Sequence, residues 1–502
     1  MQRTGRAPVG WQEKLCETFA PVGPAIDLAI FRITMAVFLA WNDSVVVADA
    51  SAMLPEASRV PPYGVGWLVP LLTITPESVR AVRVVLWIAC ALAGLGVLAQ
   101  ASMAVAVIAA SYVMLVPQLG GAVFHDHHLL WLAVIVAASP CGDALSIDAW
   151  LARRRGAPRP TRGRAHGAAI RAAWLVLGCV FFFPGVHKLR TSGLDWILSD
   201  NLRNQMWWKW AEDPATQPSF RIDRYPALLH LGAGAAVAFE LAFPFLIFGR
   251  RTRALGVIAA LLFHAATEHF MGIRFTVLWV TYGVFVPWER LLAWIDARPG
   301  ASTPPARLPL LPERERVGER DCEETAGATL LRSTSALSPT PARSISAPPS
   351  APSRDARALR TLALVAFPLL LGIATAGSLA LVDAYPFACY PTFAWIVPDH
   401  MPALEVATID PESGARTVLS RALWRDEHEP REWATEWSVI GCYDDFEPGR
   451  LEAYFRARLA ARPALAAAAH GRALALSRVE ITIDPDHRGE VLSRRPLLVI
   501  DP

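Results

Sequence analysis

The sequence has few charged residues for its length. Of its 502 residues, 19% are Asp, Glu, Lys or Arg, whereas about a quarter is usual in soluble domains, and 53% are hydrophobic. The 48 Lys and Arg nearly balance the 45 Asp and Glu and concentrate in short loops, so no nucleic-acid partner is expected. The mean hydropathy of +0.31 indicates long lipid-facing segments instead.

Cysteines are also few and widely spaced. The seven Cys include no Cys-x-x-Cys pair and no zinc-ribbon spacing, so neither a disulfide scaffold nor a cysteine-built metal site is predicted. We therefore expect no bound metal. Cys389 and Cys442 both lie in the C-terminal region, where an oxidising compartment would allow a disulfide between them; two free thiols are the alternative.

Long apolar stretches recur along the chain. A membrane-spanning helix needs about 20 apolar residues, and nine stretches meet or approach that length. They are Pro24–Val46, Val82–Ala99, Ala101–Val116, Ala122–Ser139, Ala168–Val186, Ala227–Phe248, Ala254–Phe270, Gly272–Val286 and Thr361–Val382. The predicted fold class is therefore an all-α multipass transmembrane helical bundle.

Three short stretches between or after the spans are rich in arginine. They follow Trp150, Phe248 and Trp288. Loops of this kind stay on the cytoplasmic side, and all three fall on one side when the spans are counted. We therefore expect a cytoplasmic N-terminus in a bacterial inner membrane, with the region after Val382 in the periplasm.

Composition divides the chain into four regions. Residues 1–297 are predicted to form a membrane domain of about eight spans. Residues 298–358, rich in Pro, Ser, Ala and Arg, lack the apolar periodicity of a packed domain and are predicted to be a disordered cytoplasmic linker. The ninth transmembrane helix occupies residues 359–384, and residues 385–502 follow as a small periplasmic domain.

The last region has the patterns of a small α+β domain. Leu404–Ile409 and Val479–Ile483 alternate between apolar and polar residues, as half-buried strands do. Leu451–Ala469 is rich in Ala with apolar residues at helical spacing, so it is predicted to form one helix.

Ionisable side chains interrupt the apolar stretches. Each costs roughly 2.5–3.5 kcal/mol at the centre of a membrane on insertion scales, so each marks a candidate functional position. The predicted orientation places "HDHH" at 125–128, the His187–Lys188 pair and the His264–His269 stretch at one level. We expect a single polar pocket open toward the periplasm. The full set is Asp27, Arg32, His125, Asp126, His127, His128, His187, Lys188, Glu240, His264, Glu268, His269 and Arg274.

These residues also have structural interpretations. Lys188 at a helix end could extend to the membrane surface, and the histidines of "HDHH" could be ordinary interfacial residues. Arg32 could form a structural ion pair with Glu240 or Asp27. A histidine-ligated iron or copper oxidoreductase is a further alternative, but the "HDHH" spacing differs from the "HxxHH" box of membrane desaturases. Its ligands would come from His125, His127, His128, His264 and His269.

Four groups of motifs occur in a recognisable order. Phe31-Arg32 in the first span is followed by "HDHHLL" with "SIDAW", then by "FFFPGVHKLRTSGLDW", and last by "LLFHAATEHFMGIRF". Over about residues 20–292 this order resembles the vitamin K-dependent gamma-carboxylase family. The shared module of that family is the horizontally transferred transmembrane (HTTM) domain.

The resemblance implies roles for individual residues. Lys188 matches the family's base toward vitamin K hydroquinone, and His127 matches its functional histidine. Asp126 stands in place of an Asn, and His187 replaces the first lysine of the family's pair; both join the predicted catalytic set. An ammonium cannot accept a proton, so an apolar pocket beside His187 would favour the neutral amine that this role needs. The predicted substrate- or cofactor-binding residues are Arg32, Glu240, His264, Thr267, Glu268 and His269.

The resemblance also implies the reaction. Reduced vitamin K or a related quinol reacts with O2 to give a base that removes a γ-proton from a peptidyl glutamate. CO2 adds to the carbanion, and the quinone leaves as its epoxide. A membrane-embedded pocket keeps water from that base and admits an apolar quinone from the membrane lipid. A secreted or periplasmic peptide or protein is the expected substrate.

Two other functions stay open. The C-terminal region is much shorter than the lumenal portion of the family's animal members, so the chain could carry out epoxidation alone. It could also bind and mature a peptide without carboxylase activity.

Overall fold

The computed structural model describes residues 17–53, 56, 59, 61–62, 65–119, 125–297, 393–424 and 448–501. By its internal contacts the chain divides into one unit of Met1–Glu289 with Arg354–Pro502 and a second unit of Arg290–Ser353. The helical membrane region and the C-terminal region therefore belong to the same unit.

Six helical stretches of the described residues are long and apolar enough to cross a membrane. Each coincides with a predicted span, so the chain is a mostly helical, multipass membrane protein. The first stretch, Ala25–Asp49, combines α2 (Ala25–Ala40) with α3 (Asp43–Ser51). The others are α4 (Pro76–Leu95), α5 (Ala99–Gln118), α8 (Arg164–Ser192), α11 (Pro226–Phe248) and α12 (Arg253–Met271).

The predicted count of nine spans is not confirmed. The fourth predicted span contains the short helix α6 (His128–Ala138), and the eighth contains α13 (Thr276–Thr281) followed by η6 (Tyr282–Phe285). At about 1.5 Å per residue, α6 covers roughly half of the hydrocarbon core. The ninth predicted span and the predicted linker 298–358 lie outside the described residues.

Local sequence signals define both ends of α4. The Thr75 hydroxyl accepts the N–H of Ser78 at 3.2 Å, and the Ser78 hydroxyl accepts the N–H of Thr75 at 3.0 Å. Pro76 occupies the first turn, where no hydrogen-bond donor is needed. Gly96 ends the helix with a φ of 73°, a left-handed conformation that glycine adopts without strain.

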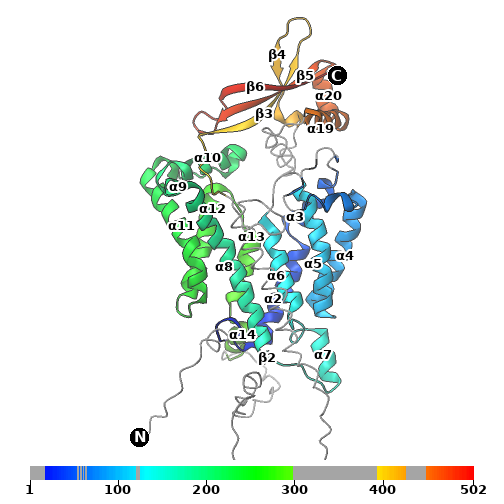
Figure 1. The fold of residues 1–502 in the computed structure, drawn as a ribbon, viewed down its shortest axis with the longest axis vertical. Helices are drawn as coiled ribbons and strands as arrows, with labels where there is room; N and C mark the ends of the chain where they lie inside the picture. Colours follow the sequence, from blue (N-terminus) through cyan, green and yellow to red (C-terminus); the bar gives the residue numbers. More distant parts are fainter. Residues whose placement is uncertain are drawn as a thin grey trace, which may run out of the picture. The chain divides into compact units, whose positions relative to one another are not determined.

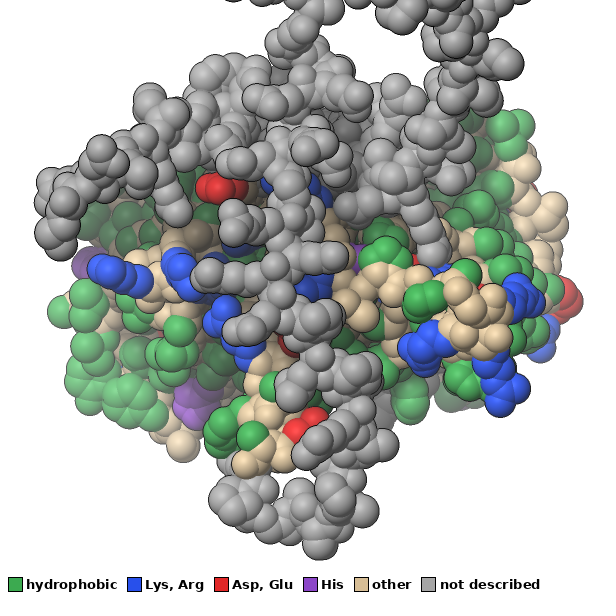
Figure 2. All heavy atoms as spheres, turned by 90° about the horizontal axis from the view of Figure 1, so that it is seen from below, with side chains coloured by type: hydrophobic (Ala, Val, Ile, Leu, Met, Phe, Trp, Pro, Cys, Tyr) green, Lys and Arg blue, Asp and Glu red, His purple; other side chains and the backbone are tan. Residues whose placement is uncertain are grey.

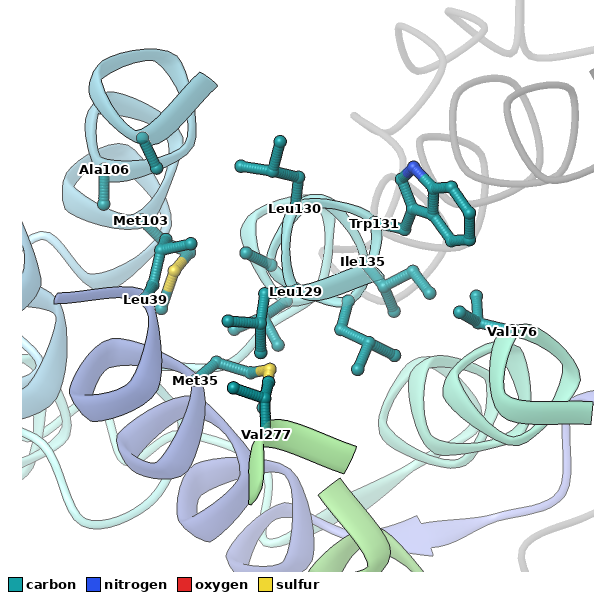
Figure 3. Close-up of a cluster of buried hydrophobic side chains, with 14 of the residues drawn as sticks. Met35, Leu39, Met103, Ala106, Leu129, Leu130, Trp131, Ile135, Val176 and Val277 are labelled. Atoms are coloured by element: carbon teal, nitrogen blue, oxygen red, sulfur yellow. The ribbon is translucent and has the colours of Figure 1, made fainter. Parts of the chain in front are cut away.

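The short helix α6 lies within the main hydrophobic core. Leu129 and Ile135 of this helix are at most 1% exposed. Figure 3 shows Met35 of α2, Val176 of α8 and Val277 of α13 among the side chains gathered around it. A helix with apolar side chains on all faces is normally buried on all of them, either in a protein core or in a membrane. Here protein rather than lipid surrounds it.

Helix α11 packs against both α8 and α12 (Figure 1). At one end, residues 193–225 connect α8 to α11 and form what we call the cap. The cap contains α9 (Asp195–Leu198), α10 (Asn201–Glu212), η4 (Pro214–Thr216) and η5 (Ile222–Arg224).

The opposite end of α8 is rich in arginine, and we call it the basic end. Here α7 (Ile147–Arg154) is followed by β2 (Arg162–Gly163), which pairs antiparallel with β1 (Gly23–Pro24). Figure 2 views this end and shows Lys and Arg side chains gathered on it. Arg162 forms an ion pair with Glu289 in α14 (Trp288–Asp296).

The C-terminal region contains an antiparallel sheet of order β4-β3-β5-β6. Leu404, Leu476 and Phe455 belong to its separate hydrophobic core. The small strand-containing region is therefore confirmed. Its elements are β3 (His400–Ile409), β4 (Arg416–Val418), α17 (Arg421–Trp424), α19 (Pro448–Ala461), α20 (Pro463–Ala469), β5 (Ala473–Thr482) and β6 (Val491–Ile500).

The prediction of one continuous helix over Leu451–Ala469 is wrong. The stretch divides into α19 and α20 at Arg462, whose backbone is extended. Pro463 follows directly. Proline disfavours the helical conformation in the residue before it and has no N–H to continue the helix, but it is well suited to begin a new one.

Candidate functional site

A cavity of about 570 Å³ lies between α8, α11, α12, α13 and the cap. Its walls are mainly aromatic and aliphatic, with Phe181, Phe239 and Phe263 among them. The volume lies in the range of about 300–1,000 Å³ that is typical of small-molecule sites. Its polar lining residues are Lys188, Gln205, Glu240, His264 and Thr267.

Lys188 and Glu240 form an ion pair in the wall of this cavity. The Lys188 Nζ donates to Glu240 Oε1, and the two side chains are only 6% and 4% exposed. The ring of Trp196 lies 5.0 Å from the same Nζ, at cation–π distance. The ion pair is therefore buried in largely apolar surroundings.

Glycines on α8 permit this contact. A Cβ atom at Gly185 would lie 3.0 Å from the Glu240 Cβ, and one at Gly178 would lie 3.1 Å from the Pro244 Cβ. Small residues at a membrane helix interface let two backbones approach closely. Lys188 follows Gly185 by three residues, on the same side of the helix, and therefore meets Glu240 on α11.

His264 of α12 adds a second polar group to the cavity wall. Its Nε2 lies 2.6 Å from the Tyr282 hydroxyl, and its ring centroid lies 5.1 Å from that of Phe275. Within the described part of the chain, neither His264 Nδ1 nor Glu240 Oε2 has a hydrogen-bond partner. Buried polar atoms without partners cost free energy, so both atoms can bind a polar group of a ligand.

A comparison with family models covers this whole site. The model of the HTTM domain matches residues 19–287, which is more than half of the chain. The chain belongs to the HTTM domain family. The family resemblance predicted from the sequence is thereby confirmed. Neither the curated proteins nor the solved structures give a significant match.

The HTTM region contains the predicted residues near the start of α6, but they do not line the cavity. They lie on the turn η3 (His125–His127). Asp126 accepts hydrogen bonds from the N–H and hydroxyl of Ser44 at 3.3 and 3.2 Å. The ring of His127 packs edge-on against Trp131, with centroids 5.2 Å apart.

Other predicted residues are divided between the cavity and its surroundings. Thr267 lines the cavity and donates to the His264 carbonyl at 2.9 Å. His187 is fully buried on α8 without lining the cavity. Glu268 lies 3.5 Å from Arg274 in a largely exposed pair, and His269 also lies outside the lining. Of the predicted site residues, the structure brings together Lys188, Glu240, His264 and Thr267 in the cavity lining.

Arg32 lies elsewhere in the bundle. Its guanidinium donates to the carbonyl oxygens of Cys141 and Leu145, each at 2.6 Å. The ion pair with Glu240 or Asp27, considered from the sequence, is not formed within the described residues. Backbone carbonyls of the loop after α6 accept its hydrogen bonds instead.

The structure bears only in part on the predictions about metals and about a disulfide. The side chain of His125 and the residues Cys389 and Cys442 lie outside the described part, so their disulfide stays a prediction. Among the described residues, no group of three or more His, Cys, Asp or Glu side chains is arranged to hold a metal ion.

A segment of the C-terminal region borders the cavity. Phe393 is one of the lining residues, and its carbonyl accepts the indole N–H of Trp196 at 2.6 Å. The next carbonyl, of Ala394, accepts the Ser192 hydroxyl at 2.7 Å. We call residues 393–397 the strap.

The far end of the strap is held by α10. The N–H of Val397 donates to Asn201 Oδ1 at 2.9 Å, and its carbonyl accepts from Asn204 Nδ2 at 2.8 Å. Both asparagine side chains are buried. The strap is therefore bonded at both ends to the helices that form the cavity.

Sequence reasoning missed Trp196, Tyr282 and Phe393. The first closes the motif "FFFPGVHKLRTSGLDW", eight positions after Lys188, and helical spacing could have placed it two turns away. Composition gives a stronger signal for the location of the site itself, because lysine occurs only at positions 14, 188 and 209. No local signal points to Phe393, since its contact depends on tertiary structure.

Proposed function

We propose that this chain is a vitamin K-dependent carboxylase-like enzyme that oxidises a quinol in the cavity, with Lys188 as base. The observation that carries the proposal is the buried Lys188–Glu240 pair in the wall of an apolar cavity. Membership of the HTTM family supports it.

The residues present fit a reduced quinone. Aromatic side chains such as Phe181, Phe239 and Phe263 offer flat apolar contacts. The cavity is bordered by helices that are long and apolar enough to span the membrane. The unpartnered atoms Glu240 Oε2 and His264 Nδ1 can bind ring oxygens. When bound, a reduced quinone would supply the electrons for the reaction with O2.

The proposed role of Lys188 as base rests on this pair. Its shared proton can reside on Lys188 or on Glu240, and the net charge is zero in both forms. Apolar surroundings penalise the charge-separated form, so the form with neutral amine and carboxylic acid becomes accessible. In that form Lys188 accepts a proton from a hydroxyl group held in the cavity. We assign His264, not His127, as the neighbouring imidazole, because His264 lines the cavity.

We further propose that proton abstraction is coupled to addition of CO2 to a glutamate of a secreted or periplasmic peptide, with epoxide as the second product. In this proposal the basic end is cytoplasmic, the cap and C-terminal region are periplasmic, and the membrane is the bacterial inner membrane. The arginine-rich loops support this orientation.

The test uses the full chain in lipid nanodiscs with vitamin K hydroquinone, measuring O2 uptake and epoxide formation. Lys188→Arg keeps the charge beside Glu240 but cannot become a neutral base. We expect turnover to fall about 100-fold or more, since a positioned base contributes about 10²–10⁴. Lys209→Arg is the matched control, because Lys209 pairs with Glu212 at 2.7 Å outside the cavity lining. Unchanged turnover in a folded Lys188→Arg protein would contradict the assignment.

The position of the strap favours peptide binding as a second candidate. Phe393 shows that the cavity wall accepts an aromatic side chain from a segment without helix or strand structure. A peptide-maturation protein without quinol chemistry would bind a Phe-containing peptide here. That function is favoured if the wild-type protein binds such a peptide but neither binds nor oxidises vitamin K hydroquinone.

A further inference from the structure

Two arginines contact one tryptophan at the basic end. Arg171 lies on α8 and Arg253 begins α12, and the guanidinium carbon of each lies 4.0 Å from the ring centroid of Trp174. The ring is fixed, because its Nε1 donates to the Val284 carbonyl at 3.2 Å. The two guanidinium carbons are therefore no more than about 8 Å apart.

Neither arginine has a carboxylate partner in the residue ranges that the structure describes. Arg253 Nε donates to the Ile247 carbonyl at 2.9 Å, which leaves its two terminal nitrogens. Arg171 makes no hydrogen bond to a described residue, and its guanidinium lies over the rings of Trp174 and Phe248. Two like charges so close repel each other, and charges at membrane depth are normally paired. An anion between or beside them would remove this cost.

A small cavity gives room for that anion. It has a volume of about 160 Å³, and Arg171, Trp174 and Arg253 all line it. Asp27 also borders it, but its carboxylate accepts the N–H of Glu289 at 3.0 Å and is not within ion-pair distance of either arginine. The cationic side of the cavity is therefore open to a ligand.

Both arginines lie near one end of a helix that is long and apolar enough to cross a membrane. Arg171 lies about 10 Å, two turns, from the start of α8 at Arg164. Arg253 is the first residue of α12, whose N-terminus has no side-chain cap and carries the positive end of the helix dipole. Two and five residues further along α12, Leu255 and Ile258 are 60% and 54% exposed, as lipid-facing residues of a spanning helix are. Lipid therefore has access to this edge of the bundle.

We infer that Arg171 and Arg253 form a binding site for the phosphate of an anionic phospholipid, with Trp174 positioning both guanidinium groups. Arginine binds phosphate oxygens through two parallel N–H donors, and basic pockets between transmembrane helices bind anionic headgroups. Inorganic phosphate shares this chemistry, but it lacks the acyl chains that the exposed apolar face of α12 would contact. The site is separate from the Lys188 cavity and does not depend on the function proposed for it.

The test is native mass spectrometry of the full chain after titration with phosphatidylglycerol, phosphatidylcholine or inorganic phosphate. We expect one tightly held phosphatidylglycerol, and its affinity should fall about tenfold or more in Arg171→Gln/Arg253→Gln. The control Arg250→Gln/Arg251→Gln removes the same charge from the adjacent loop and should stay within about twofold of wild type.

Three results would overturn the inference. They are unchanged phosphatidylglycerol affinity in the Arg171/Arg253 variant, equal binding of phosphatidylcholine, and displacement of the lipid by equimolar inorganic phosphate. If the double variant does not fold, Arg171→Gln alone serves the same test, because Arg171 has no hydrogen bond to a described residue whose loss would affect folding.

Discussion

The indole N–H of Trp196 donates a 2.6 Å hydrogen bond to the carbonyl of Phe393, across 197 residues of sequence. The ring of the same tryptophan lies 5.0 Å from the Lys188 Nζ. One side chain therefore contacts both the buried ion pair and the strap. Trp196 therefore connects the strap directly to the proposed base, Lys188.

The first prediction concerns this tryptophan. Trp196→Phe keeps an aromatic ring near Lys188 but removes the donor to Phe393. We expect faster amide hydrogen exchange at Ala394 and Val397, because a hydrogen bond of this kind contributes about 1 kcal/mol. The measurement is hydrogen exchange with mass spectrometry on the full chain in nanodiscs. Trp41→Phe, at a tryptophan that is 77% exposed, should leave exchange in the strap unchanged. Equal exchange in both variants would contradict the contact.

The second prediction concerns the stability of the ion pair. Removing one buried partner leaves an uncompensated charge, so Lys188→Met and Glu240→Leu should each lower the free energy of unfolding by about 3–5 kcal/mol. The double variant Lys188→Met/Glu240→Leu should recover most of that loss while staying inactive. Unfolding in a detergent titration measures all four proteins. Additive losses in the double variant would show that the two side chains do not interact.

The third prediction concerns the approach of α8 to α11. In Gly185→Ala the new Cβ would lie 3.0 Å from the Glu240 Cβ, so we expect a loss of about 1–3 kcal/mol in the free energy of unfolding. Turnover should fall as well, because Lys188 moves away from its partner. Gly234→Ala on α11 is the control: its Cβ would have ordinary contact at 3.7 Å with Ile197. Alanine there should be neutral or stabilising.

The fourth prediction concerns pH and the turn between β5 and β6. The hydrogen bond from His487 to Asp484 and the charge of that carboxylate raise the pKa of His487 above its ordinary 6.5. Burial opposes ionisation of Asp484, but the Asp486 N–H and His487 outweigh it and lower the Asp484 pKa below 3.8. The turn is therefore most stable between the two shifted values. The histidine contribution is complete below about pH 6.5 and disappears as pH rises through its raised pKa.

Histidine-selective NMR of the full chain tests this prediction. The His487 titration midpoint should lie above 6.5 in the wild-type protein and fall in Asp484→Asn. Asp410→Asn, in a different turn of the sheet, should leave it unchanged. The turn also contacts the cap, through an ion pair of Asp486 with Arg221 at 3.3 Å. Loss of the His487–Asp484 pair at high pH should weaken that contact.

The long spans could be predicted from the sequence, whereas the roles of the short apolar helices could not. The stretch that became α8 is apolar over the length of a bilayer, and a single segment satisfies its own backbone hydrogen bonds there as a helix. The residues of α6 are equally apolar, but sequence does not distinguish a helix surrounded by protein from one surrounded by lipid. Only the packing of Met35 and Val176 around Leu129 reveals the difference.

Three of the five polar residues that line the cavity followed from the cost of charge in a membrane. Lys188, Glu240 and His264 were all predicted because each is expensive at membrane depth. Their pairing was not, because it depends on where Gly185 lets α8 meet α11. The same cost argument also selected Arg32, whose charge is satisfied by backbone carbonyls that no sequence pattern reveals.

The burial of α6 also constrains how the protein is made. Its 11 residues are too short to be inserted as an independent span, and its neighbours include α8, which is synthesised later. We therefore expect α6 to enter the bilayer only when the surrounding helices assemble, in the second stage of membrane protein folding. A nascent chain that ends before α8 would expose this apolar helix and become a substrate for membrane quality-control proteases.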